Sequence, residues 1–443
     1  MNKIHITLTA SAALFAAITS GVIIADGKKE PVPSVLRFSS EPPIRGATEK
    51  VLEEILEEVE TAGNSSSKNS GEEMNQTLIP KPDAIKSATK WLISRQQENG
   101  GWGPGHVPAG VAERTTVGNT CIALQALIRD GHSPTTGEYR EEVSAALAYV
   151  LSEIENSDQE SLFVTNIRDS QLQSKLGTYV DTFIAATALP EFKGKTSNKK
   201  EAIRLDEGVK KLLAKIEANQ AEDGSWKNAG WAPTLAQGFA AKSVNRAAQL
   251  GWKVDESVRE RAEEFGRKNF DADSGTFSSV GSAGVELYSN SSSLQQIQDS
   301  AITNRTLKPQ LEVEFAEATT KEARDAAESK LKKFADVEEN LVAAQDAVVK
   351  RLEDPSFVAG FGNNGGEEFL SYVNIGESLR DKGGEDWEKW NTKMSANMVR
   401  TQANDGCWKG QHCITGGTFC TSTGLLVLLM DKETPDQLVS SAE

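Results

Sequence analysis

Cysteine, histidine and aromatic residues are scarce in this chain, which has four cysteines, four histidines and an aromatic content of 6% over 443 residues. So few aromatics supply little for an aromatic-walled ligand cavity. Clusters of basic residues are also missing, and the formal net charge is −16. An acidic surface repels phosphates and anionic headgroups, which argues against nucleic-acid binding.

Long hydrophobic runs are missing as well, with one exception at the N-terminus. Lys3 is followed by an uncharged segment over residues 6–24, and Ala25 precedes Asp26. This layout predicts a secretory signal peptide over residues 1–25, and hence an exported, periplasmic or extracellular protein without a transmembrane domain in its mature chain. The alternative is an uncleaved anchor, because the run is nearly long enough to span a bilayer.

Residues 26–80 read as an acidic linker rich in Ser and Asn, which can bury little apolar surface. One amphipathic helix is expected within it, over TEKVLEEILEEVE (48–60), where apolar residues share one helical face. The main domain is expected over residues 81–433, followed by a short tail over 434–443.

A motif recurs three times without gaps in the main domain: Gln, two variable residues, Asn or Asp, Gly, one variable residue, Trp. Each copy ends a stretch of helical periodicity. The Asn/Asp-Gly pair suits a left-handed helix stop, after which the Trp folds back onto the helix and the Gln bonds exposed backbone. The motif residues are Gln96, Gly100, Trp102, Gln220, Gly224, Trp226, Gln402, Gly406 and Trp408.

Helical periodicity predicts an all-α domain of six helical hairpins with a spacing of some 60 residues. The outer helices are expected near 83–97, 138–154, 203–220, 255–268, 319–353 and 386–402. Their inner partners, richer in small and apolar residues, are expected near 117–130, 177–189, 233–250, 282–298, 367–379 and 418–431. Six apolar inner helices favour a closed ring, because an open solenoid needs polar caps at both ends.

Residues 300–353 are longer and more charged than this period allows, and they predict a long helical insertion. Thr319 and Glu322 have the spacing of a capping box at its start. Two interpretations remain open: an outer helix packed on its neighbours, or a protruding arm that contacts a partner.

The Gln…Asp-Gly-x-Trp element resembles the QW motif of the prenyltransferase and squalene oxidase repeat. On this motif, the chain resembles the terpenoid cyclase and prenyltransferase-like superfamily over about residues 83–431. The resemblance implies an α/α toroid, with six inner helices around a cavity and six outer helices around them. It does not transfer the chemistry, which each family builds from its own residues.

The catalytic motifs of these families are missing or incomplete. The cyclase Asp-x-Asp-Asp is absent, and its nearest approach, Asp271-Ala272-Asp273-Ser274, lacks the last acid. No cysteine is followed by Gly, which excludes the thioester motif Cys-Gly-x-Gln. Asp405 and Cys407 match the zinc-binding Asp-x-Cys of prenyltransferases, but no histidine follows His412.

The stretch QANDGCWKGQHC (402–413) carries two of the four cysteines. In an oxidising compartment, an even cysteine count favours disulfides. The preferred interpretation is a stapled turn with a Cys407–Cys413 disulfide, and a Cys121–Cys420 disulfide that locks the first inner helix to the last. The alternatives are a zinc site made of Asp405, Cys407, His412 and Cys413, a redox site, and buried free thiols. No metal or cofactor is predicted.

Polar residues at the expected starts of inner helices are the candidates for a binding or catalytic site. Asp181, Glu286 and Glu368 are weak catalytic candidates, because carboxylates beside tyrosines suit acid/base work. The candidate ligand-binding residues are Tyr179, Gln237, Tyr288, Tyr372, His412 and Thr421. The acids suit helix starts equally well, where they complement the helix dipole.

The sequence therefore predicts an exported α/α-toroid protein that acts as a non-catalytic ligand-binding or scaffold protein, for a small molecule or a protein partner. One alternative is a divergent enzyme acting on an isoprenoid, which only the resemblance favours. Another is a glycan-active enzyme using the cavity carboxylates, which only the acid–tyrosine pairs favour.

Overall fold

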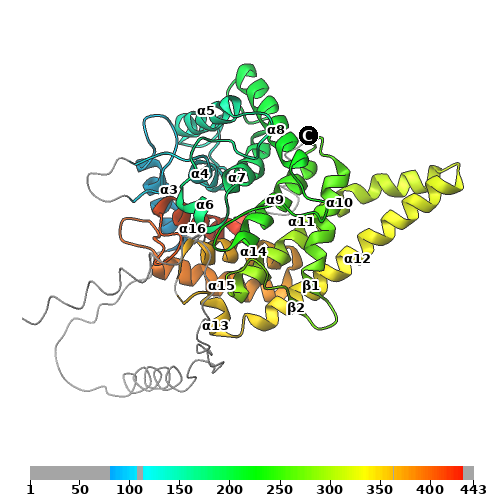
Figure 1. Cartoon of the computed structure of the whole chain (residues 1–443). Helices are drawn as coiled ribbons and strands as arrows, with labels where there is room; N and C mark the ends of the chain where they lie inside the picture. Colours follow the sequence, from blue (N-terminus) through cyan, green and yellow to red (C-terminus); the bar gives the residue numbers. More distant parts are fainter. Residues whose placement is uncertain (1–79, 107–112, 363, 433–443) are drawn as a thin grey trace, which may run out of the picture. The chain divides into compact units, whose positions relative to one another are not determined.

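The computed structural model describes residues 80–432 except 107–112 and 363, and these residues fold mainly into helices (Figure 1). Every described residue belongs to one unit, residues 76–443. The predicted signal peptide, the linker helix over 48–60 and the tail over 434–443 lie outside the described residues. The prediction of an all-α protein is confirmed.

Six helices are largely buried, apart from residues 305–317 of the fourth, which are mostly charged or exposed. The last of them, GTFCTSTGLLVLL, has no charge at all. These helices are α4 (Val117–Arg129), α7 (Val180–Ala188), α9 (Pro233–Gln249), α11 (Glu286–Glu317), α14 (Gly366–Lys382) and α16 (Gly417–Leu429). Each contacts the next in this order, and α16 contacts α4, so the contacts run in a closed cycle.

Six amphipathic helices pack against this buried set with one face only. In α8, for example, Leu205, Val209 and Leu212 are buried while the lysines and glutamates between them are mostly exposed. These helices are α3 (Lys81–Ser94), α5 (Arg140–Asn156), α8 (Lys199–Ala218), α10 (Glu256–Lys268), α12 (Lys321–Arg351) and α15 (Gly384–Thr401).

Short elements join the long helices. They are α6 (Gln171–Lys175), α13 (Pro355–Val358), the 3-10 helices η1 (Leu189–Phe192) and η2 (Met430–Lys432), and a two-stranded antiparallel hairpin of β1 (Phe270–Asp271) and β2 (Thr276–Phe277) in which Phe270 pairs with Phe277. None of the described helices has the length and apolar character needed to cross a membrane.

The three repeated motifs share one geometry. Each glycine has a positive φ (86° at Gly100, 88° at Gly224, 91° at Gly406). Each Trp is buried and donates its indole N–H back to the helix that it follows. The acceptors are the carbonyls of Leu92 at 2.7 Å, Ile216 at 2.8 Å and Met398 at 2.9 Å.

The glutamine of each motif makes a second contact that ties two of the amphipathic helices together. Gln96 donates to the carbonyl of Glu142 in α5 at 2.8 Å, and Gln220 donates to that of Val258 in α10 at 2.9 Å. Gln402 donates to the carbonyl of Ala84 at 2.8 Å, which links α15 near the end of the domain to α3 at its start.

Helices α11 and α12 form an antiparallel pair whose far end extends away from the other helices (Figure 1). We call this far end, residues 305–335, the arm. A small apolar cluster of Leu311, Ala327 and Phe334 holds it together, separately from the main core. The other half of α12 packs into that core through Val337, Leu341 and Val348. One half of α12 therefore packs on its neighbours, as the first interpretation expects, and the other half protrudes. Contact of the arm with a partner stays a prediction.

The start of α12 differs from its prediction by one residue. Thr320, rather than Thr319, is the N-cap, and its hydroxyl accepts from the backbone N–H of Ala323 at 3.2 Å. Glu322 is then too close to the cap to complete the box, which needs an acid three residues on.

Candidate metal centre

Three side chains that could hold a metal ion meet where the loop between α15 and α16 crosses the start of α14. Glu367 is the second residue of α14, and His412 and Cys413 are neighbours in the loop. Backbone bonds hold the loop in place: Gln411 N–H donates to the carbonyl of Asn364 at 2.9 Å, and Gly366 N–H donates to that of Ile414 at 3.0 Å.

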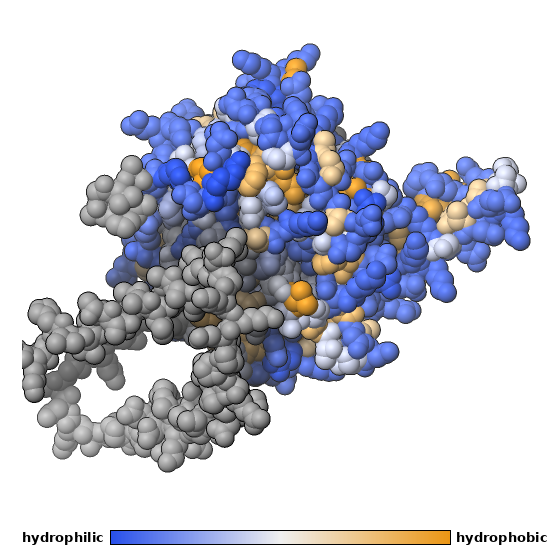
Figure 2. Space-filling view, viewed as in Figure 1, coloured by the Kyte–Doolittle hydropathy of each residue, from blue (hydrophilic) through white to orange (hydrophobic). Residues whose placement is uncertain are grey.

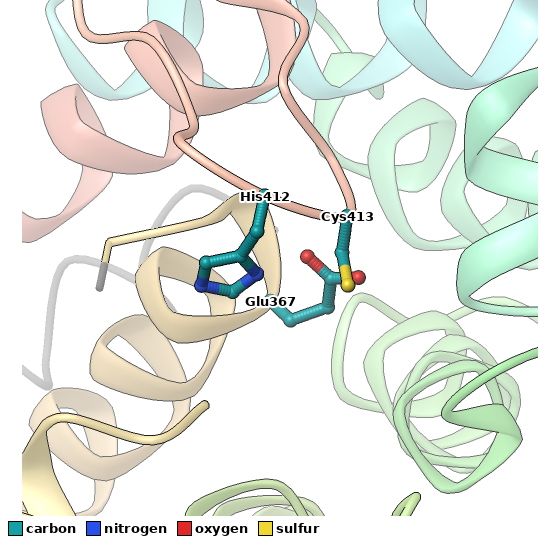
Figure 3. Close-up of side chains that lie close together, drawn as sticks. All are labelled: Glu367, His412 and Cys413. Atoms are coloured by element: carbon teal, nitrogen blue, oxygen red, sulfur yellow. The ribbon is translucent and has the colours of Figure 1, made fainter. Parts of the chain in front are cut away.

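The candidate ligand atoms of Glu367, His412 and Cys413 all lie within 4.8 Å of one another. Figure 3 shows a ring nitrogen of His412, the carboxylate of Glu367 and the sulfur of Cys413 turned toward a common space. Cys413 has a positive φ of 49°, which is uncommon outside glycine and turns up at functional sites. Thiolate, imidazole and carboxylate are the usual ligands of zinc.

Glu367 is fully buried, and this burial, together with the neighbouring charge of Glu368, raises its pKa to about 7. One carboxylate oxygen accepts from the backbone N–H of Ile414 at 3.1 Å. The other, Oε1, has no hydrogen-bond partner among the described residues. An unpaired buried oxygen costs about 1–3 kcal/mol, and a bound cation would supply its missing partner.

Cys413 is a half-buried thiol beside this carboxyl group. Burial and the charge of Glu367 raise its pKa above the ordinary thiol value, and Lys175 opposes this effect. A thiol whose pKa is raised is a poor free nucleophile. It becomes a thiolate when a metal ion displaces its proton.

Glu368 orients the imidazole of His412 from the far side. Its Oε2 lies 3.4 Å from His412 Nε2, so Nδ1 is the ring nitrogen left to face Glu367 and Cys413. Glu368 is itself held by the N–H groups of Gly365 at 2.9 Å and Phe361 at 3.0 Å and by the hydroxyl of Tyr288. Carboxylates that fix a ligating histidine in this way are common at zinc sites.

Two exposed aromatic side chains border the centre. The ring of Phe361, which is 53% exposed, lies 5.2 Å from that of His412. Trp231, which is 42% exposed, meets Phe361 edge to face at 6.0 Å. Exposed aromatic pairs are unusual on a protein surface and often mark places where a ligand or partner binds.

The other predicted acids lie outside this centre and already have partners. Asp181 accepts from the N–H of Gly118 at 2.7 Å, at the start of α4, and from Gln173 at 2.9 Å. Glu286 forms an exposed ion pair with Arg351 at 2.6 Å.

The predicted ligand-binding residues are divided between the centre and the scaffold. Gln237 and Thr421 each accept from a motif Trp backbone N–H at 3.0 Å, which supports the turn. Tyr372 donates to the carbonyl of Val358 at 2.9 Å, and Tyr179 packs on Phe163. Of this predicted set, only His412 belongs to the metal centre. Tyr288 contacts it indirectly, by donating to Glu368.

Both predicted disulfides are wrong, because all four cysteines are free. Cys407 lies with its sulfur 3.8 Å from His106 Nε2, and Cys420 donates to the carbonyl of Ile414 at 3.5 Å. Cys413 turns toward Glu367 instead of Cys407. Cys121 is buried in α4.

The zinc site considered from sequence is not formed as a single site. Its four residues fall into two pairs: Asp405 and Cys407 lie in the turn of the third motif, and His412 and Cys413 lie beside Glu367. Asp405 accepts from the N–H of Cys407 within its own turn at 3.3 Å. Glu367 was missed because its partners lie 45 residues further along the chain. The one available signal was a pair of adjacent acids at the start of an inner helix.

One small cavity lies among five of the six buried helices. This cavity, bordered by side chains of α4, α9, α11, α14 and α16 and by Glu191, measures about 20 Å³, room for roughly one water molecule. Charged groups occupy this region. Arg129 pairs with Glu191 at 2.9 Å, and Lys242 pairs with Glu377.

Comparison of this chain with family models and with curated proteins finds no match. Its function is therefore inferred from the residues and contacts of the site.

Proposed function

We propose that this protein is an exported α/α-toroid protein of the prenyltransferase-like type, which binds a zinc-like divalent cation at Glu367, His412 and Cys413 and acts as a non-catalytic binding scaffold. The observation that carries the proposal is the unpaired, fully buried oxygen of Glu367 beside an imidazole and a thiol.

The toroid is supported by the cyclic order of contacts among the six buried helices. The repeated motif supports it too, since each glutamine joins one outer helix to the next and the third joins the last to the first. The resemblance to the prenyltransferase and squalene oxidase repeat rests on the same motif.

A metal-binding scaffold agrees better with the side chains than an isoprenoid enzyme does. An isoprenoid needs a cavity of hundreds of Å³, whereas the cavity bordered by Glu191 among the buried helices is about 20 Å³ and lined by charged groups. The glycan alternative needs carboxylates available for acid/base work. Asp181 is committed to a helix start and Glu286 to an ion pair.

The test is metal binding by the purified full chain. We expect one equivalent of Zn²⁺ to bind, and Co²⁺ in its place to give a thiolate charge-transfer absorption band. E367Q, H412A and C413S should each weaken Zn²⁺ binding by about 10-fold or more. C407S is the matched control and should bind as the unmodified chain does.

Affinity should also rise with pH, because Glu367, with a pKa of about 7, and the Cys413 thiol must both lose protons to bind the ion. A Zn²⁺ affinity unchanged in C413S and E367Q would contradict the proposal. So would a Co²⁺ complex without the thiolate band.

A further inference from the structure

A second candidate site lies on the side of the molecule where α15 faces α12 and α13, over α14. The pocket there has a volume of about 780 Å³. We call it the flank pocket. Its volume falls in the range of roughly 300–1,000 Å³ that is usual for sites of small organic ligands. None of the three metal-centre residues lines it.

The floor of the flank pocket is apolar. Tyr372, Trp390 and Met394 line it and are nearly fully buried, and the two aromatic rings meet edge to face at 6.2 Å. The hydroxyl of Tyr372 already donates to the carbonyl of Val358 at 2.9 Å. The phenol therefore contributes mainly its ring, and the floor suits an aromatic or alkyl group.

The rim of the pocket on α15 is basic, although the whole chain carries a net charge of −16. Lys389, Lys393 and Arg400 all line it. Lys393 has no hydrogen-bond or ion-pair partner among the described residues, and Arg400 donates to the amide oxygen of Asn397 at 2.7 Å. Neither cation is neutralised by an acid of its own.

The acids near this rim are placed differently. Asp386 is bound by Lys382 at 2.6 Å, which removes much of its charge from the pocket. Glu353 follows the C-terminal end of α12, on the wall of the pocket that faces α15. An anionic group would therefore be held on the α15 side, between Lys393 and Arg400.

We propose that the flank pocket binds an amphipathic anion, with an aromatic or alkyl body on Tyr372, Trp390 and Met394 and a carboxylate or sulfonate head at Lys393 and Arg400. The proposal is independent of the metal centre. Burial of the apolar body supplies most of the affinity, and the two cations select a negative head group.

The experiment is calorimetric titration of the full chain with dodecanoate, with dodecanol as the uncharged comparison. Dodecanoate should bind at least about 10-fold more tightly than dodecanol. Added salt should reduce this difference in affinity, because salt screens the charges of the rim. C413S should bind dodecanoate unchanged, which separates this site from the metal centre.

Two charge-reversal variants change the net charge equally, one at the rim of the pocket and one away from it. K393E/R400E should weaken dodecanoate binding by about 10-fold or more and leave dodecanol binding unchanged. K210E/K268E reverses two exposed lysines on α8 and α10, each of which pairs with an acid four residues before it as Lys389 does. This control should bind dodecanoate as the unmodified chain does.

V358W places a bulky ring at the pocket wall and should weaken binding of both probes. Equal binding of dodecanoate and dodecanol by the unmodified chain would overturn the proposal, whether or not any variant folds. Equal losses in the two charge-reversal variants would also overturn it, because the effect would then come from net charge alone.

Discussion

Glu367 and Glu368 are adjacent acids with different surroundings. Consecutive residues of a helix point about 100° apart, so their side chains face different neighbours. Glu368 turns back to the N-terminal end of α14 and accepts from the N–H groups of Gly365 and Phe361. Glu367 faces the loop of His412 and Cys413 and keeps one oxygen without a partner. Glu368 is structural, and Glu367 is the acid available to a cation.

The glycines of the three motifs are required for two separate reasons, conformation and space. Gly406 has a φ of 91°, which costs other residues about 1–2 kcal/mol. A Cβ there would also lie 2.6 Å from the carbonyl oxygen of Ser87 in α3, far inside van der Waals contact. At Gly100 the corresponding approach is 2.5 Å to the carbonyl oxygen of Ala145 in α5.

We predict that G406A lowers the free energy of unfolding by about 3 kcal/mol or more, because backbone strain and a clash with α3 add together. The matched control is G194A, where φ is also positive at 74° but nothing lies within 4 Å of the new Cβ. The free energy of unfolding of G194A should fall by only about 1–2 kcal/mol. Urea unfolding measures both, and equal losses would show that the contact with α3 is unimportant.

At the scale of the element, α12 belongs to two cores. Its N-terminal half packs on α11 through Phe334 in the small cluster of the arm, and its C-terminal half enters the main core through Leu341. The arm is otherwise charged and exposed, and Figure 2 shows mainly hydrophilic side chains over it, with apolar ones between them. Its stability should therefore be local.

We predict that F334A opens the arm without unfolding the domain, because it empties a cluster that contacts little else. Hydrogen exchange should become faster within residues 305–335 and stay slow in α4, α7 and α16. L341A, at the other end of the same helix, should instead lower the global free energy of unfolding by about 2–5 kcal/mol. The idea of two independent cores fails if F334A speeds exchange throughout the molecule.

At the scale of the whole molecule, a buried charge network joins helices that are distant in sequence. Glu191 accepts from Arg129 at the end of α4 and from Arg246 in α9 at 3.3 Å. The positive charges of Lys242 and Arg246 lower the pKa of Asp299 in α11, but burial outweighs them and raises it to about 7. Its Oδ2 has no partner among the described residues.

Asp299 makes folding stability depend on pH. Its pKa in the folded protein, about 7, is above the ordinary value of 3.8, so the folded state binds the extra proton between these values. The contribution of Asp299 to folding stability is therefore fully present below about pH 4, and this contribution is lost as the pH rises through 7.

We predict that D299N removes this loss, because the amide is neutral at every pH. Relative to the unmodified chain, its free energy of unfolding should rise by about 1–3 kcal/mol between pH 5 and pH 8. S300A, a neutral change at the next buried position, should leave the pH dependence as it is. Parallel pH profiles for D299N and the unmodified chain would rule out Asp299 as the titrating group.

Much of the local structure could be predicted from sequence, because it depends on neighbours in the chain. Apolar periodicity predicts where helices lie, and the Asn/Asp-Gly pairs predict where α3, α8 and α15 stop. The predicted cap of α12 is wrong by one residue, because Thr319 and Thr320 are equally suitable cap residues by type.

The candidate site could be predicted only in part. His412 was identified from its type and place, but Cys413 was assigned to a disulfide because an even number of cysteines in an exported chain favours pairing. Pairing also needs the right Cβ directions, which spacing in sequence does not define. The left-handed backbone at Cys413 turns its thiol toward Glu367 instead.

The sequence by itself determined the helical class, the three identical turns and the scarcity of aromatic side chains, because these depend on composition and on contacts within a few residues. Only the tertiary structure decided that the cavity bordered by Glu191 is small, that the thiols stay apart, and that Glu367 meets His412 and Cys413. Those outcomes depend on how helices distant in sequence pack together, and side-chain volumes and buried charges settle that packing for the whole domain at once.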